Sequence, residues 1–491
     1  MIRSSIKFPA PGLLVSSRVR TVVIAALVGL SLSACTVGPD YQRPDIVLPA
    51  TYQTGATTTN LIALAADQVA DPAKLIKPDW WTLFEDPELD ELMRMALVEN
   101  ADLLIAIARI SEAIALAQQA GAPAYPSLAL SGSGVRGSSG AAATPTGVQV
   151  MSNTSQVGLT AAYEFDVWGK IRRSREAANA QVTASVFNKD SVALVTAGLV
   201  SNTYLSLRSL DAQVTVMKSS IETRSKSLKI AEAKLEGGLV SPIDVNQAIA
   251  AKAASGALLA DLVRRRELAQ NQLAVLTGKL DLSLPAKDVR SLPIPPVPPA
   301  GLPSTLIENR PDVRQAEQDL VTANARIGVA KANFFPSFTL TASYGAQSVD
   351  FRQFLATPSN IWSMALGLAQ PLFTGGLLQG KLDYANAVQQ EILAVYVKTL
   401  RTSFRDVSDA LVGVRQNLLA ENELTVQVGA SGKAQDLAML RYEAGYVDYL
   451  TVLEAQRSFN DASLAYVINR AARLQSSVDL FKALGGGWQP Q

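Results

Sequence analysis

The chain has 491 residues with 44 basic and 43 acidic side chains, a single cysteine and no histidine. The balanced charge argues against a nucleic-acid-binding protein, which shows a concentrated basic patch. Without histidine, Ser-His-Asp and Cys-His catalysis are excluded and the commonest zinc ligand is missing. Since no phosphate-cradling loop is found either, we expect no enzymatic activity, no cofactor and no metal site.

The first predicted element is an export signal over residues 1–34. Four basic side chains precede a short apolar run over 21–30, and the motif Leu-Ser-Ala-Cys35 follows. This order is typical of a bacterial secretory precursor. We expect Cys35 to be acylated and to hold the new N-terminus in a membrane leaflet. The alternative for Cys35 is a buried free thiol. Thr36 follows it in place of an acidic residue, which favours sorting to the outer membrane. No transmembrane helix is expected after the signal, because no later stretch of eighteen apolar residues occurs.

The rest of the chain contains an internal repeat. Four motifs of the first half recur in the same order in the second, at offsets of 206 to 210 residues: Asn100-Ala-Asp-Leu103 with Arg310-Pro-Asp-Val313, Tyr125-Pro-Ser-Leu128 with Phe335-Pro-Ser-Phe338, Val167-Trp-Gly-Lys170 with Phe373-Thr-Gly-Gly376, and Leu235–Val240 with Tyr442–Val447. The unit is too long for a solenoid repeat, so we predict a duplicated domain.

Each half begins with an alanine-rich helix, and a Pro-Ser step leads into two strands. Apolar residues alternate with small or polar ones over 157–167 and 337–344. Alternation with a period of two indicates strands, and segments of this kind are what a transmembrane β-barrel needs. A soluble sandwich with one wet face is the alternative. Four strands cannot close a barrel alone, so the barrel interpretation requires an oligomer.

A long helical hairpin completes each half. No proline occurs over 171–241 or 372–488, and apolar residues from Leu207 to Leu235 follow a 3-4 spacing that only Arg224 interrupts. This heptad pattern predicts helices packed side by side. A helix over 171–236 is roughly 100 Å long, so it must project as a rod or as part of a tube wall. Glycines then end the first helix of each hairpin.

The predicted organisation has six parts. They are the signal peptide (1–34); a lipid-anchored and equatorial segment (35–98); a first repeat (99–280) with strands near 127–137 and 155–168 and a hairpin tip near 238–244; a proline-rich linker (281–309); a second repeat (310–484) with strands near 337–347 and 361–373 and a tip near 445–451; and a C-terminal tail (485–491).

Motifs spread over the whole mature chain resemble those of one family. They are the lipobox followed by Thr36-Val-Gly-Pro-Asp-Tyr41, Trp80-Trp81, Asn309-Arg-Pro-Asp312, Phe334-Phe-Pro336, Thr374-Gly-Gly376, Tyr449-Leu-Thr-Val-Leu-Glu-Ala-Gln-Arg457 and Lys482-Ala-Leu-Gly-Gly-Gly-Trp488. In this combination the chain resembles the outer membrane factors, the TolC-like channels of tripartite export systems. It is most similar to their lipoprotein efflux type, exemplified by OprM.

The resemblance implies a mixed α and β fold and a homotrimer. Each protomer would give four strands to one twelve-stranded transmembrane β-barrel and two coiled-coil hairpins to one periplasmic α-helical barrel. The assembly would be a passive exit duct for drugs or other small toxic compounds. It would lie in the outer membrane, contact its lipid, and be driven by an inner-membrane pump of the RND type through a periplasmic adaptor (membrane fusion) protein.

The resemblance also places a periplasmic gate on the second hairpin. Leu450 matches the apolar constriction and Glu454 the acidic ring, and their i, i+4 spacing puts both on one helix face. Three converging carboxylates repel one another and attract cations. Arg457, three residues on, can pair with Glu454. Val447 replaces a basic residue that contributes to closure in some members.

Further gate and docking residues lie at the hairpin tips. In the first half Asp244 and Gln247 match the partner hairpin, and Tyr442 matches a tyrosine that bonds across hairpins to the aspartate. The tip positions assigned to adaptor contact are Gly238, Ser241, Gly445 and Asp448.

Two other functions remain open at this point. The same architecture serves protein or peptide secretion with a different pump, although the lipobox and the Gly-Gly-Gly-Trp ending favour efflux. A lipid-anchored structural coiled coil would explain the heptads, but it would leave the alternating strands with their aromatic residues unexplained.

Overall fold

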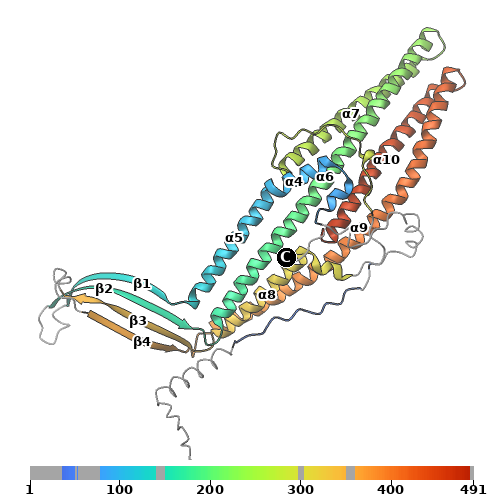
Figure 1. Cartoon of the computed structure of the whole chain (residues 1–491). Helices are drawn as coiled ribbons and strands as arrows, with labels where there is room; N and C mark the ends of the chain where they lie inside the picture. The colour runs from blue at the N-terminus through green and yellow to red at the C-terminus, as the bar shows by residue number, and fades with distance from the viewer. Residues whose placement is uncertain are drawn as a thin grey trace, which may run out of the picture. The chain divides into compact units, whose positions relative to one another are not determined.

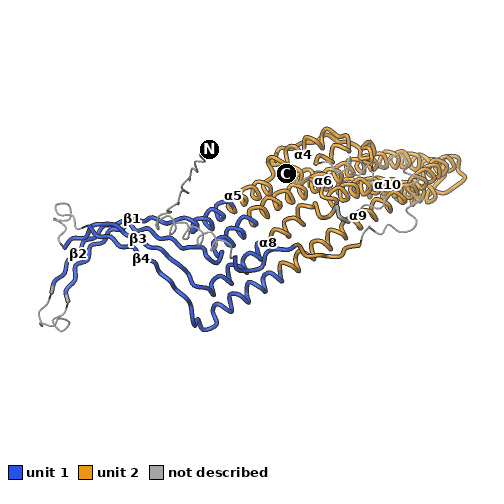
Figure 2. Tube along the Cα trace, turned by 60° about the horizontal axis from the view of Figure 1, so that its bottom comes forward, with its two compact units in different colours: residues 1–42, 114–180, 320–391 blue, residues 43–113, 181–319, 392–491 orange. Residues whose placement is uncertain are grey.

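The structure, a computed structural model, describes residues 36–49, 52, 78–139, 150–296, 304–349 and 360–486. The signal sequence and Cys35 lie outside the described residues. The chain forms two compact units, coloured separately in Figure 2: a first unit of residues 1–42, 114–180 and 320–391, and a second unit of residues 43–113, 181–319 and 392–491. Each unit combines segments of both repeats, so this division does not follow the repeat boundaries.

The first unit holds a four-stranded antiparallel sheet whose strands lie side by side in chain order (Figure 1). The strands are β1 (Ser127–Ser139), β2 (Val150–Phe165), β3 (Ser337–Ser348) and β4 (Asn360–Ala369).

The strand ends differ from those predicted by alternation. β2 begins at Val150, whereas its predicted start is near 155. It ends at Phe165 and β4 ends at Ala369, whereas the predicted ends are near 168 and 373. β2 ends because Asp166 turns to accept hydrogen bonds from the amides of Ile171 and Arg172. β4 ends shortly before Pro371, which has no amide hydrogen for a ladder.

The register gives the sheet one apolar face. Leu130, Leu159, Tyr344 and Trp362 lie directly opposite one another across all four strands. Directly opposed residues share a face, so these side chains form one continuous row. They are exposed in the single chain, Trp362 by 77%. The other face carries small and polar residues, such as the hydrogen-bonded hydroxyls of Ser343 and Ser363.

The helices repeat with similar lengths in both halves. The pairs are α5 (Ala101–Gly121) with α8 (Pro311–Ala332), α6 (Lys170–Glu236) with α9 (Leu377–Glu443), and α7 (Pro242–Leu276) with α10 (Tyr449–Ala483). α6 and α9 each have 67 residues, and α7 and α10 each have 35. Among the described residues, no helix is long and apolar enough to cross a membrane.

Shorter helical elements lie between these pairs. They are η2 (Trp80–Phe84), α4 (Pro87–Glu99), η3 (Ala122–Ala124), η5 (Val289–Ser291) and η6 (Ser304–Asn309). η2 and α4 bury Trp80, Phe84 and Leu89 in the core of the second unit, together with apolar residues of α6, α7 and α10. The Trp80 ring stacks on Phe481 at 5.6 Å between centroids.

In the first unit, residues 36–42 are fixed against the strand–helix junction. The Val37 amide donates to the carbonyl of Trp168 at 3.0 Å, and Asn324 of α8 donates to the carbonyl of Pro39. Gly38 has φ +108°, and a Cβ there would lie 2.5 Å from the Cα of Gly328. Only glycine fits this close approach, so the segment has one defined path along the junction.

Candidate functional site

The candidate site is the pair of hairpin tips, which lie next to each other within the second unit (Figure 1). The turn between α6 and α7 spans 237–241, and that between α9 and α10 spans 444–448. An apolar cluster, the tip cluster, lies beneath the turns and consists of Ala248, Ala438, Tyr442, Tyr449 and Val452. Val447 packs against this cluster.

Both turns are built by the same local interactions. Gly238 and Gly445 have φ +66° and +83°, and the amides of Leu239 and Tyr446 donate to the carbonyls of Lys234 and Arg441. This is the Schellman arrangement, which needs a left-handed residue and therefore favours glycine.

The next helices begin with matched N-caps. Ser241 accepts a hydrogen bond from the amide of Ile243, and Asp448 accepts from the amide and the hydroxyl of Thr451. The hydrogen bonds from Thr451 lower the pKa of Asp448. The four positions assigned to adaptor contact are thus the residues that shape the two turns.

The gate positions lie on the exposed side of α10. Leu450 is 53% exposed, and the side chain of Glu454 is 57% exposed. Glu454 pairs with Arg457 at 2.8 Å, as the spacing suggests. All three side chains are therefore outside the tip cluster and available to a neighbouring molecule.

The interaction between hairpins differs from the one expected for Tyr442. Tyr442 is 2% exposed, and its hydroxyl has no hydrogen-bond partner among the described residues. The hydrogen bond to Asp244 that the resemblance implies is not formed within the single chain. Asp244 still acts through its charge: burial, and then this charge, raise the pKa of Tyr442. Gln247 lies half-buried on α7, three residues after Asp244.

Lys234 of α6 forms the contact between hairpins that sequence reasoning missed. Its Nζ donates to the carbonyl oxygens of Tyr442 and Glu443 at the end of α9, at 2.6 and 3.2 Å. A cation is favourable there because the last carbonyls of a helix carry partial negative charge. The only signal in the sequence is a lysine in the last turn of the neighbouring helix.

The described residues contain no cluster of three or more His, Cys, Asp or Glu side chains that could hold a metal ion. The tips instead offer an apolar cluster, exposed side chains on α10 and two rigid turns. This arrangement is suited to contacts between helices.

Comparison with known proteins identifies the family. The profile described as "Outer membrane efflux protein" matches residues 92–279 and 302–486, one segment in each repeat. The chain belongs to the outer membrane efflux protein family. Its members are transport proteins, and this chain is accordingly an outer membrane component of an efflux system.

Curated relatives support this over nearly the full length. The solvent efflux pump outer membrane protein SrpC of Pseudomonas putida is 34% identical over 94% of this chain and 97% of its own. The cation efflux system protein CusC of Escherichia coli is 30% identical over 94% of this chain and 98% of its own.

Solved structures have the same fold. The outer-membrane channel OprN superposes with a TM-score of 0.84 at 28% identity, covering 93% of this chain and 100% of OprN. The open state of the MtrE outer membrane channel of Neisseria gonorrhoeae gives a TM-score of 0.79 at 30% identity, covering 92% and 98%.

Proposed function

We propose that three copies of this chain form the outer membrane duct of a tripartite efflux system. The observation that carries the proposal is the sheet of the first unit, which has an exposed apolar face and two edge strands, β1 and β4. An apolar face of this extent marks a surface that meets lipid or another protein.

The two open edges are the reason for a trimer. In lipid, each unsatisfied backbone group costs several kcal/mol, so a sheet inserted in a membrane must close on itself. Pairing β4 of one copy with β1 of the next joins three sheets into one twelve-stranded barrel, with the apolar rows outside and the serine-rich face inside.

The N-terminal segment supports a lipid anchor at Cys35. Residues 36–42 follow a fixed path at the end of the strands, next to Trp168, whose ring stacks on Phe335 at 4.8 Å. Aromatic residues of this kind are typical of membrane interfaces. An acyl chain on Cys35 would enter the membrane close by. In Cys35→Ser, acyl labelling should be lost and uncleaved precursor should accumulate; labelling that persists would exclude this site.

The hairpin tips are the proposed docking site for a periplasmic adaptor, which would join the duct to an inner-membrane pump of the RND type. The rigid turns at Gly238, Ser241, Gly445 and Asp448 support this assignment, because they present a fixed surface. The relatives are named for the efflux of toluene, solvents, antibiotics or cations, which favours small toxic compounds over secreted proteins as the transported class.

Native mass measurement of the full chain in mild detergent tests the proposal. A trimer should be the main species, and it should form ion-conducting channels in a planar bilayer. A monomer as the dominant species, or a trimer that never conducts, would contradict the duct.

A further inference from the structure

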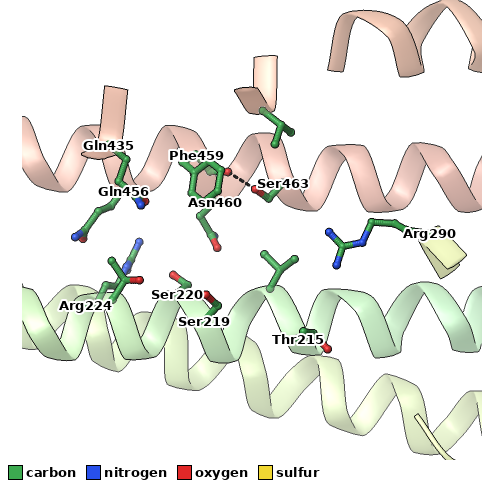
Figure 3. A pocket seen from close by; sticks show the side chains of 13 residues that line it. Thr215, Ser219, Ser220, Arg224, Arg290, Gln435, Gln456, Phe459, Asn460 and Ser463 are labelled. Atoms are coloured by element: carbon green, nitrogen blue, oxygen red, sulfur yellow. Dashed lines mark hydrogen bonds between the residues drawn. The ribbon is translucent and has the colours of Figure 1, made fainter. Parts of the chain in front are cut away.

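A cavity of about 300 Å³, partly open to solvent, lies in the second unit between α6 and α10, and residues of α9 also line it (Figure 3). Its lining includes Arg224, Ser219 and Ser220 on α6 and Gln456 and Asn460 on α10. At about 30 Å³ per water, the cavity has room for several waters or for an ion with part of its hydration shell.

Arg224 is the unusual member of this lining. It is 8% exposed, its Nη1 donates to the carbonyl of Ala251, and its Nε has no partner among the described residues. In the described part of the chain it forms no ion pair. Burial lowers the pKa of Arg224, and the charge of Asp461 acts in the opposite direction.

Other arginines of the same unit are neutralised. Arg208 is fully buried, and it pairs with Glu88 at 2.7 Å and with Asp211 at 2.9 Å. Arg290, which also lines the cavity, pairs with Asp288 at 2.5 Å. A guanidinium stays protonated in proteins, so Arg224 keeps its charge. Unlike the other two arginines it has no carboxylate in salt-bridge contact among the described residues, and Asp461 acts on it only at longer range.

The opposite wall offers further polar atoms. Asn460 is 9% exposed and Gln456 3% exposed, and the side-chain oxygen of each has no hydrogen-bond partner within the described chain. Gln456 is held by its Nε2, which donates to the hydroxyl of Ser227 at 2.7 Å. The two ends of an amide are assigned from the hydrogen-bond network, so Asn460 can equally turn its NH₂ group into the cavity.

We propose that this cavity binds a small inorganic anion, such as chloride, at the guanidinium of Arg224. The anion supplies the missing counter-charge, and the hydroxyls of Ser219 and Ser220 and the NH₂ of Asn460 complete its shell with water. Water alone would satisfy the free Nε but would leave the buried charge uncompensated. Bound in this way, the anion joins α6 of the first hairpin to α10 of the second.

Bromide is the probe for this site. Crystals of the full chain soaked in sodium bromide should show an anomalous peak beside Arg224, and the peak should be absent in Arg224→Gln. Lys226→Gln is the matched control, because Lys226 is exposed on the same helix and pairs with Glu222. No peak in the parent protein, or a peak that survives Arg224→Gln, would overturn the proposal.

A second variant keeps the test valid if Arg224→Gln does not fold. Asn460→Asp places a carboxylate in the cavity and should replace the anion. Its Tm should no longer depend on bromide beyond the general salt effect, whereas the Tm of the parent and of Lys226→Gln should rise with bromide as expected for a ligand of the folded state. Equal bromide dependence in the parent and Asn460→Asp would show that no anion binds at Arg224.

Discussion

The Nζ of Lys234 on α6 lies 2.6 Å from the carbonyl oxygen of Tyr442 on α9 and 4.6 Å from the centre of the Tyr442 ring. One side chain therefore joins the two hairpins by a charge-assisted hydrogen bond and a cation–π contact. Since Tyr442 is buried in the tip cluster, this contact connects the end of α6 directly to that cluster.

Lys234→Met should loosen the two tips. The variant keeps the apolar stem but loses the hydrogen bonds and the cation–π contact, and a hydrogen bond to a charged group contributes about 1.5–3 kcal/mol. If the tips close the proposed duct, the fraction of time that the channel is open should rise about tenfold or more, since about 1.4 kcal/mol is a factor of ten. Single-channel recording in a planar bilayer measures this.

Lys226→Met is the control for Lys234→Met. Lys226 lies on the same helix, is 70% exposed and pairs with Glu222 at i, i+4. It should leave the open fraction unchanged. Equal conductance in the parent and both variants would show that Lys234 does not hold the tips together.

The sequence contains local signals for the turns at the hairpin tips. Gly238 and Gly445 supply left-handed residues, and Ser241 and Asp448 supply N-caps, all within a few residues along the chain. Lys234 could not be found in this way. Its partner is 208 residues away, and a lysine in a long helix is by pattern an exposed residue.

The strand ends and the surroundings of Arg224 likewise depend on interactions that the local sequence pattern does not show. Alternation predicts β2 and β4, but their ends depend on the capping of α6 by Asp166 and on Pro371, which period-two patterning does not register. Arg224 is visible in the sequence as the polar residue in an apolar seam. That it has no salt-bridge partner among the described residues becomes clear only when α6 and α10 lie together.

Acid should weaken the start of α10. The pKa of Asp448 is held below its usual value of about 3.9 by its hydrogen bonds from Thr451. A lowered pKa in the folded state means that the stabilisation is present above about pH 4 and is lost as the pH falls through the folded-state pKa. The protection factor of the Thr451 amide in hydrogen exchange should therefore fall in this acid range. Asp448→Asn keeps an acceptor and should show no such fall. If the protection of the Thr451 amide has the same pH dependence in the parent and in Asp448→Asn, the Asp448 carboxylate does not stabilise the start of α10.

Asp86 should be essential for the stability of the second unit. It is fully buried, accepts from the hydroxyl of Tyr204 at 2.5 Å, and pairs with Lys287 at 2.9 Å. Asp86→Ala removes the acceptor of Tyr204, the partner of Lys287 and the N-cap of α4. Because Lys287 is 35% exposed and can be solvated, the loss should be about 2–4 kcal/mol. Tyr204→Phe removes one hydrogen bond and should cost about 1–2 kcal/mol. Denaturant midpoints of the two variants test this order, and a smaller loss for Asp86→Ala would refute it.

Leu450 and Glu454 should form the periplasmic constriction of the proposed trimer. They lie one turn apart on the exposed side of α10, so three copies can bring three leucines and three carboxylates towards one axis. Such a ring narrows the duct and attracts cations. Leu450→Ala combined with Glu454→Ala should raise the conductance of the closed channel several-fold and weaken its cation preference.

The matched control is Ile243→Ala, at the position of α7 that is equivalent to Leu450 at the offset of 207 residues and is likewise exposed. This variant should leave the cation preference unchanged, because it removes no carboxylate. Arg457→Ala should act in the opposite direction to the loss of Glu454: it removes the cation that pairs with Glu454 at 2.8 Å, so the cation preference should increase. If the double alanine variant of α10 conducts and selects like the parent, the constriction lies elsewhere in the duct.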